Sequence, residues 1–102
     1  MKLLITTSLK EDQKEIVAIF DKAQIKVFSY TDIIGYKNDH SINLLDNWFA
    51  SGDEKFDSIF LFSFTPDENA LTALSLVTEY NQKTKSDYPI RAFIVPVEQS
   101  SY

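Results

Sequence analysis

The order of strand and helix patterns along the chain is the strongest constraint on its fold. A strand pattern, a helix pattern and a second strand pattern occur in that order, and the same order then returns. Strand patterns are rich in β-branched and aromatic residues, and helix patterns repeat apolar residues every three or four positions. The first unit covers 2–8, 9–24 and 25–36, and the second covers 56–64, 66–83 and 89–97. Two such units in 102 residues predict a single domain over 1–102.

Each helix pattern begins with a motif that is typical of helix N-termini. Ser8 stands three residues before Glu11, and Thr65 stands three residues before Glu68, which is the spacing of a capping box. Pro66 suits the first helical position. The two halves of the chain are therefore alike, and we expect a ferredoxin-like α+β sandwich of order βαββαβ. Its four-stranded antiparallel sheet carries both helices on one face.

Apolar stripes define the faces of the helices that should contact the sheet. The stripe of the first helix is Ile16, Ile19, Phe20 and Ala23, with Val17 beside it, and that of the second is Ala70, Leu71, Leu74, Val77 and Tyr80. At the ends of the second helix, Asp67 and Glu68 precede Lys83 and Lys85, which suits the helix dipole.

The third strand is apolar on both of its faces. Ile59 and Leu61 point one way, while the phenylalanines at 60, 62 and 64 point the other way. Phe93, Val95 and Val97 repeat this pattern in the last strand. Because the helices cover only one face, the second face needs another cover. We expect a homo-oligomer formed by sheet-face packing; the alternative is that the segment 37–54, with Trp48 and Phe49, covers this face in a monomer.

Composition excludes several classes of function. The net charge of −5 and the isoelectric point near 4.7 argue against nucleic-acid binding. The absence of cysteine excludes disulfides and thiolate metal sites. The apolar run at 3–5 is too short for a signal-peptide core, and no stretch approaches the ~20 apolar residues of a membrane span. We expect a cytoplasmic protein.

The chain resembles the P-II signalling family. In both, an opening strand, here MKLLITTS, leads to a helix and then to a strand that ends in a glycine–aromatic pair, here Gly35–Tyr36. A long loop, here 37–54, and a strand, a helix and a strand follow. The resemblance implies a compact homotrimer with inward-facing sheets and small effectors in the clefts between subunits. It also implies a partner-binding loop at 37–54, here with His40, Trp48 and Phe49, that contacts a transporter or another partner.

The chain departs from the P-II pattern between the second helix and the last strand. The nucleotide-binding members of the family carry a glycine-rich phosphate-binding loop with basic residues there, whereas residues 81–88 contain no glycine. Backbone without glycine wraps a triphosphate poorly. This departure argues against the ATP-binding mode typical of the family and leaves the ligand unknown. The chain is more similar to the reduced members, some of which are associated with heavy-metal efflux pumps or with bicarbonate transport. The phrase Asp46–Asn47–Trp48–Phe49 and the missing glycine-rich loop favour the efflux-associated group.

Two sets of residues are candidates for ligand binding. Asp39, His40 and Asp46 could supply one nitrogen and two oxygens to a divalent ion, as in a metal-binding protein resembling the cation-tolerance trimers. The alternative is a solvated histidine in a loop. Lys83, Lys85 and Arg91 could form an anion site, or the lysines could serve only the helix dipole. Trp48 and Phe49 could contact a partner, or they could fix the loop to the core.

Catalytic motifs are absent from the sequence. There is no nucleophile elbow, no zinc-protease motif and no phosphate-binding Walker loop. Acylphosphatases share the order of elements, but their phosphate loop after the first strand needs glycine and arginine, and residues 7–10 read Thr-Ser-Leu-Lys. We therefore expect a regulatory protein that senses a small ligand or a metal state and signals through residues 37–54, and not an enzyme.

Overall fold

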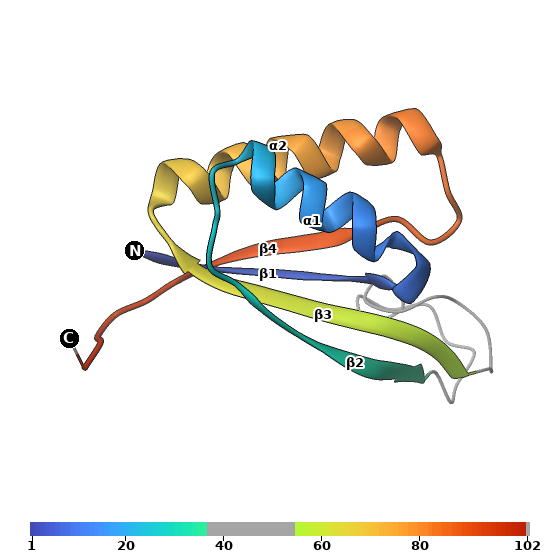
Figure 1. Ribbon diagram of the computed structural model, residues 1–102, viewed down its shortest axis with the longest axis horizontal. Coiled ribbons are helices and arrows are strands. Elements are labelled where there is room, and N and C mark those ends of the chain that lie inside the picture. The colour runs from blue at the N-terminus through green and yellow to red at the C-terminus, as the bar shows by residue number, and fades with distance from the viewer. Residues whose placement is uncertain (37–54, 102) are drawn as a thin grey trace.

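The computed structural model describes residues 1–36 and 55–101 (Figure 1). In chain order the elements are β1 (Lys2–Leu9), the 3₁₀ turn η1 (Lys10–Asp12), α1 (Gln13–Lys22), β2 (Ser29–Tyr36), β3 (Lys55–Thr65), α2 (Asp67–Thr84) and β4 (Arg91–Pro96). No helix in these two ranges is long and apolar enough to cross a membrane.

The four strands form one antiparallel sheet in the order β2-β3-β1-β4. Strand β1 lies in the middle, so that Leu4 pairs with Ser63 of β3 on one side and with Ile94 of β4 on the other. Both helices lie over the same face of the sheet, and the opposite face carries no helix (Figure 1). The expected ferredoxin-like α+β sandwich is thereby confirmed.

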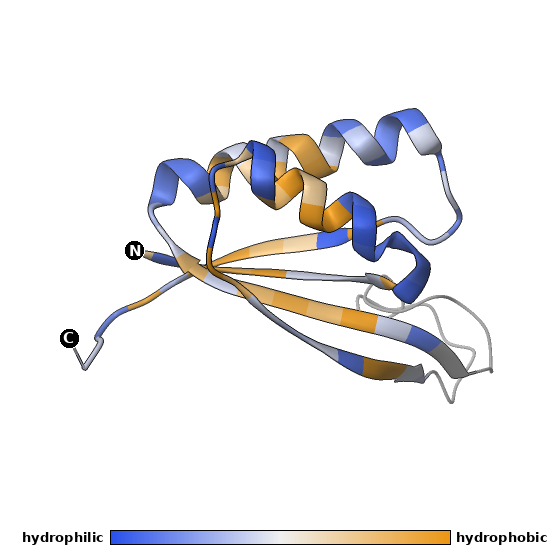
Figure 2. Ribbon diagram, in the orientation of Figure 1, coloured by the Kyte–Doolittle hydropathy of each residue, from blue (hydrophilic) through white to orange (hydrophobic). Residues whose placement is uncertain are grey.

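The core lies between the sheet and the helices. Figure 2 shows apolar residues along β3 and β4 and on parts of both helices above them. The stripe of α1 is confirmed, since Ile16, Ile19, Phe20 and Ala23 are all buried. The stripe predicted for α2 is wrong at Leu71, which is 52% exposed. Small residues at 70 and 73 face the sheet instead and allow α2 to approach it closely.

Helix α1 does not begin at the predicted capping box. Ser8 remains in β1, where it pairs with Ile59, and its Oγ donates a hydrogen bond to the carbonyl oxygen of Leu9 at 2.9 Å. The 3₁₀ turn follows, and α1 starts at Gln13 without a side-chain cap at Asp12. Pairing with β3 keeps the backbone of Ser8 extended, so the sheet overrides the local motif.

Helix α2 likewise begins one residue after its predicted start and without a side-chain cap. Thr65 is the buried last residue of β3 and pairs with Lys2. Pro66 occupies the N-cap, and its carbonyl oxygen accepts a hydrogen bond from the amide of Ala70 at 3.1 Å. The expected charges are present, with acidic residues in the first turn and Lys83 in the last.

The segment between α1 and β2 is a helix end and a connection, not the start of a long strand. Gln24 has a φ of 63°, and the amide of Ile25 bonds to the carbonyl oxygen of Phe20 at 2.9 Å. This pattern closes a helix through a left-handed residue. Ile25 is then buried in the core, and the hydroxyl of Ser63 donates to the carbonyl oxygen of Val27 at 2.7 Å. Strand β2 therefore starts at Ser29 instead of residue 25.

Candidate functional site

Part of the sheet face opposite the helices is apolar. Along this face Leu3 lies opposite Phe64 and Val95, and Ile5 lies opposite Phe62 and Phe93. The predicted alternation of β3 is confirmed, because Ile59 and Leu61 are fully buried under the helices. We call the following residues the outer apolar patch: Leu3, Ile5, Phe60, Phe62, Phe64, Phe93 and Val95.

Much of the outer apolar patch is open in the single chain. Phe64 is 56% exposed, and Phe93 and Val95 are each 39% exposed. On β3 the ring of Phe62 contacts those of Phe60 and Phe64, with centroid separations of 5.7 Å and 6.3 Å. A contiguous apolar surface of this kind is typical of an interaction site in a soluble protein.

The same face becomes polar at the next position along β1. Thr7 lies opposite Phe60 on β3 and Arg91 on β4. Its side chain is only 2% exposed, and its Oγ1 has no hydrogen-bond partner among the residues that the structure describes. A buried hydroxyl without a partner costs about 1–3 kcal/mol, which calls for an explanation. Thr7 is thus a candidate for contact with a ligand.

Arg91 supplies the charge beside this hydroxyl. It opens β4 and is half-buried. Ala92 and Ile94 pack against the core, so the side chain of Arg91 leaves the strand on the outer face, as Thr7 does. A guanidinium with five N–H donors next to a hydroxyl suits a small oxyanion, such as a carboxylate, a bicarbonate or a phosphate. We call Thr7 and Arg91 the polar pair.

Thr6 provides an instructive comparison with its neighbour. Its Oγ1 is also buried and has no partner in the described ranges. However, Thr6 belongs to the face that the helices cover, because it alternates with Thr7 along β1. Only Thr7 therefore belongs to the outer face, and the unpartnered hydroxyl of Thr6 has no explanation in the part of the chain that the structure describes.

The structure separates the three basic residues of the predicted anion site. Lys83 lies in the last turn of α2, where its Nζ is 3.0 Å from the carboxylate of Glu79. Lys85 is exposed and caps the end of that helix in a left-handed conformation. The sheet lies between the helix layer and the outer face, so Lys83 and Arg91 are on opposite sides of it. A joint site for all three residues would therefore need contributions from more than one subunit, and it stays a prediction.

The predicted metal and partner residues lie outside the described residues. These are Asp39, His40, Asp46, Trp48 and Phe49. Within the described ranges, no group of three or more histidine and acidic side chains could hold a metal ion. The metal hypothesis therefore stays a prediction.

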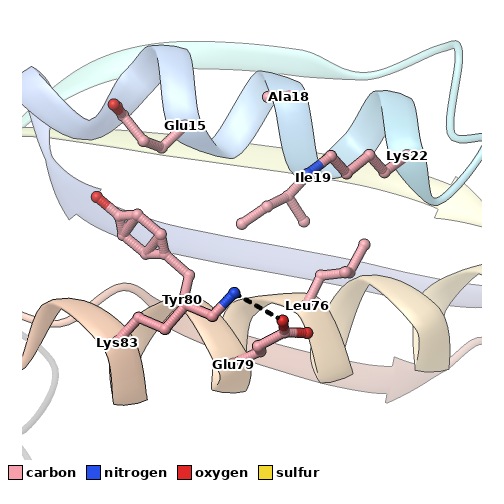
Figure 3. A pocket seen from close by; sticks show the side chains of 8 residues that line it. All are labelled: Glu15, Ala18, Ile19, Lys22, Leu76, Glu79, Tyr80 and Lys83. Atoms are coloured by element: carbon pink, nitrogen blue, oxygen red, sulfur yellow. Dashed lines mark ion pairs between the residues drawn. The ribbon is translucent and has the colours of Figure 1, made fainter.

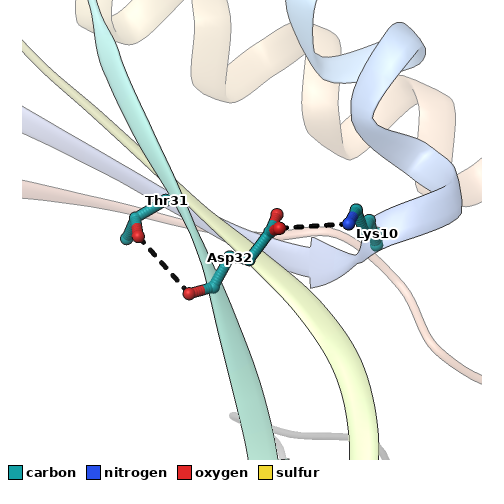
Figure 4. A network of polar contacts seen from close by, with 3 residues as sticks. All are labelled: Lys10, Thr31 and Asp32. Atoms are coloured by element: carbon teal, nitrogen blue, oxygen red, sulfur yellow. Dashed lines mark hydrogen bonds and ion pairs between the residues drawn. The ribbon is translucent and has the colours of Figure 1, made fainter.

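The strands on either side of 37–54 are firmly paired. Tyr36 at the end of β2 pairs with Lys55 at the start of β3. Lys10 of η1 forms an ion pair with Asp32 of β2, with 3.0 Å between Nζ and Oδ2 (Figure 4). The hydrogen bond and the charge of Asp32 raise the pKa of Lys10. Both groups are more than half exposed, so this pair orients β2 more than it stabilises the fold.

Thr7 was not among the site residues predicted from the sequence. It belongs to the strand that was predicted over 2–8. Alternation alone places Thr7 on the face of Leu3 and Ile5, which was a usable signal. Its position beside Arg91 depends on the register between β1 and β4, and no local pattern contains that register.

No family model matches the chain, and no curated protein matches it in sequence. Solved structures, however, match the chain in fold. A PII-like signalling protein of Thermus thermophilus has a TM-score of 0.63 at 20% identity, and the match covers 91% of this chain and 82% of that one. A DUF3240 family protein of Shewanella baltica has a TM-score of 0.54 at 19% identity, covering 99% and 93%.

A third solved structure extends this set. It is a nitrogen regulatory PII-like protein of Thiomonas intermedia, bound to ADP, AMP and bicarbonate, with a TM-score of 0.62 at 11% identity. The match covers 97% of this chain and 93% of that one. Each likeness runs over nearly the whole chain and concerns the arrangement of strands and helices. The chain therefore has the fold of the PII-like signalling proteins.

Proposed function

We propose that this protein is a regulatory signalling protein and not an enzyme. It works as a homotrimer, senses a small ligand at the boundary between subunits and passes the signal to a partner. The outer apolar patch is the observation that carries this proposal. The PII-like fold supports it, because the matching solved structures include a PII-like signalling protein and a nitrogen regulatory PII-like protein.

The outer apolar patch favours association through the sheet. Complete burial of one large apolar side chain contributes about 1.5–3 kcal/mol. Several such side chains lie on a face without a helix, so a second copy of the chain is a suitable cover. The choice of three subunits rests on the resemblance to P-II proteins.

The polar pair supports the position of the ligand. Thr7 and Arg91 adjoin the outer apolar patch on the same face, so burial of the patch places them at its edge. A small oxyanion there would receive a hydroxyl hydrogen bond and a guanidinium charge. Lys83 and Lys85 remain candidates for a second anion contact from the helix side of the sheet.

The segment 37–54 is the proposed route to the partner. It joins β2 to β3, and β3 carries three residues of the outer apolar patch. Thr7 of the polar pair lies on β1, which is the neighbour of β3 in the sheet. A ligand bound there could therefore change the conformation of the chain where the segment 37–54 joins β3. The proposed partner is a membrane transporter, such as an efflux pump, contacted through His40, Trp48 and Phe49.

Native mass spectrometry of the purified protein tests the assembly. We expect a trimer for the unmodified chain and a monomer for Phe64→Lys, because the lysine would place a charge in the buried patch. Leu71→Lys is the matched control: its exposure is 52%, against 56% for Phe64, but it lies on α2. A monomer for the unmodified chain, or equal effects of the two substitutions, would overturn the proposal.

A further inference from the structure

The two helices form an apolar groove on the side of the molecule away from the outer apolar patch. Ile19 of α1 and Leu76 and Tyr80 of α2 supply its apolar lining (Figure 3). Ala18 is small and exposed, which leaves the groove open on the side of α1. Its volume is about 220 Å³. This is below the ~300–1,000 Å³ of pockets for whole small molecules, so the groove better suits one or two side chains of a docked segment.

Charged residues line both walls of the groove, and their distribution is uneven. Glu15 lies near the start of α1 and Lys22 at its end, seven residues or about 10 Å further along. Across the groove, Lys83 is neutralised by Glu79 at 3.0 Å. One end of the groove is therefore acidic, and the other end has the cation of Lys22.

Two neighbouring groups have raised pKa values, for which burial is the larger cause and the negative charge at the acidic end the smaller one. Burial and then the charges of Asp12 and Glu15 raise the pKa of the Tyr80 hydroxyl. Burial and then the charges of Glu11 and Glu15 raise the pKa of Asp12. Figure 3 shows the hydroxyl end of Tyr80 directed towards Glu15. This end of the groove would favour a cation from a partner.

We propose that this groove docks a helical segment of a partner protein that carries a basic residue, then an apolar residue and then an acidic residue. The basic side chain binds between Glu15 and the face of Tyr80, where the carboxylate and the ring both attract a cation. The apolar residue packs on Ile19 and Leu76. The acidic residue follows the basic residue by seven positions, which is also the separation of Glu15 and Lys22 on α1. On a helix aligned with α1 it therefore lies at Lys22.

The groove is independent of the proposed trimer. The sheet separates it from the outer apolar patch, so association through that patch leaves the groove open (Figure 1). Failure of this inference would leave the proposed function untouched, and the docking test is valid for a monomer or a trimer.

The test uses two synthetic helical peptides of about four turns. One carries arginine, with leucine four residues later and glutamate seven residues after the arginine; the matched peptide has glutamate in place of the arginine, so that neither direction of binding brings a cation to Glu15. Binding to the ¹⁵N-labelled full chain is followed by amide chemical shifts. We expect saturable binding of the first peptide, with shifts in the groove residues of α1 and α2, and binding of the matched peptide that is roughly fivefold weaker or more.

Protein variants decide whether the groove itself is responsible. Glu15→Lys should weaken binding of the first peptide by about fivefold and strengthen binding of the matched peptide, whose glutamate then meets a cation. Asp21→Lys changes an exposed carboxylate of the same helix outside the groove and should leave binding unchanged. Ala18→Trp should fill the groove and abolish binding while the spectrum remains folded. Equal affinity for both peptides, equal losses in Glu15→Lys and Asp21→Lys, or no saturable binding would overturn the inference.

Discussion

At the residue scale, Thr7 is the most informative side chain. It is buried on the open face of the sheet, and its hydroxyl lacks a partner in the described ranges. Folding alone does not need this hydroxyl, since valine has nearly the same shape and is favoured in strands. A polar group that lowers stability is typical of a site that serves binding.

Replacing Thr7 with valine tests this interpretation. We expect Thr7→Val to raise the free energy of unfolding by about 1 kcal/mol, because the unpartnered hydroxyl is removed from a buried position. Urea denaturation measures this change. The same variant should bind bicarbonate or phosphate more weakly in calorimetric titrations. Lower stability together with unchanged anion binding would show that the hydroxyl has a structural partner.

Asn81 shows the opposite case, a polar side chain that the fold requires. Its Nδ2 donates to the carbonyl oxygen of Ile90 at 2.8 Å, and its Oδ1 accepts from the amide of Ile90 at 3.0 Å. Because Ile90 is buried, Asn81→Ala leaves two backbone groups without partners. We expect a loss of about 2 kcal/mol in urea unfolding. Gln82→Ala, at an exposed neighbouring position, should change stability little; similar losses would contradict this account.

His40 carries the metal hypothesis, and its test is a single substitution. If His40 binds a divalent ion with Asp39 and Asp46, His40→Ala should reduce zinc or copper affinity by at least tenfold, since imidazole is the strongest ligand of the set. Equilibrium dialysis against either metal measures this. Unchanged affinity would exclude the site.

At the scale of elements, the pairing of strands decides where each helix begins. Both predicted N-caps, Ser8 and Thr65, belong to strands in the structure. Their backbone groups are committed to the sheet, and neither helix has a side-chain cap. Helix starts that lack caps are sensitive to the charges of their first residues.

Asp12, at the N-cap of α1, makes the stability of the fold depend on pH. Its raised pKa means that the folded chain holds the proton more tightly than the unfolded chain, so stability falls as pH rises through the window between the two pKa values. We expect Asp12→Asn to stabilise the protein at pH 7 and to have no effect below the unfolded pKa near 4. Urea unfolding at pH 3 and pH 7 measures this, with Asp21→Asn as control. A gain that is equal at both pH values would contradict it.

At the scale of the whole molecule, one layer of helices on a sheet leaves one face for association. A domain of about 100 residues buries only about two-thirds of its unfolded surface, so subunit contacts add usefully to its stability. The groove between the helices lies on the other side. The molecule thus has one face proposed for assembly and another proposed for a partner.

Assembly should link stability to protein concentration. If the folded chain is a trimer, dilution favours dissociation, and the melting temperature should fall as concentration falls. Calorimetry over a hundredfold range would show this for the unmodified chain, whereas Phe64→Lys should melt at one temperature throughout. A constant melting temperature for the unmodified chain would contradict the trimer.

The sequence by itself determined the order of elements, the buried stripe of α1 and the two apolar faces of β3, because each depends on a local period of side chains along one element. Tertiary structure alone decided that Ser8 stays in a strand, that Leu71 is exposed and that Thr7 lies beside Arg91. It also decided that the sheet separates Arg91 from Lys83. These outcomes depend on the register between strands and on the rotation of a helix over the sheet, both of which are set by contacts between residues far apart in the chain.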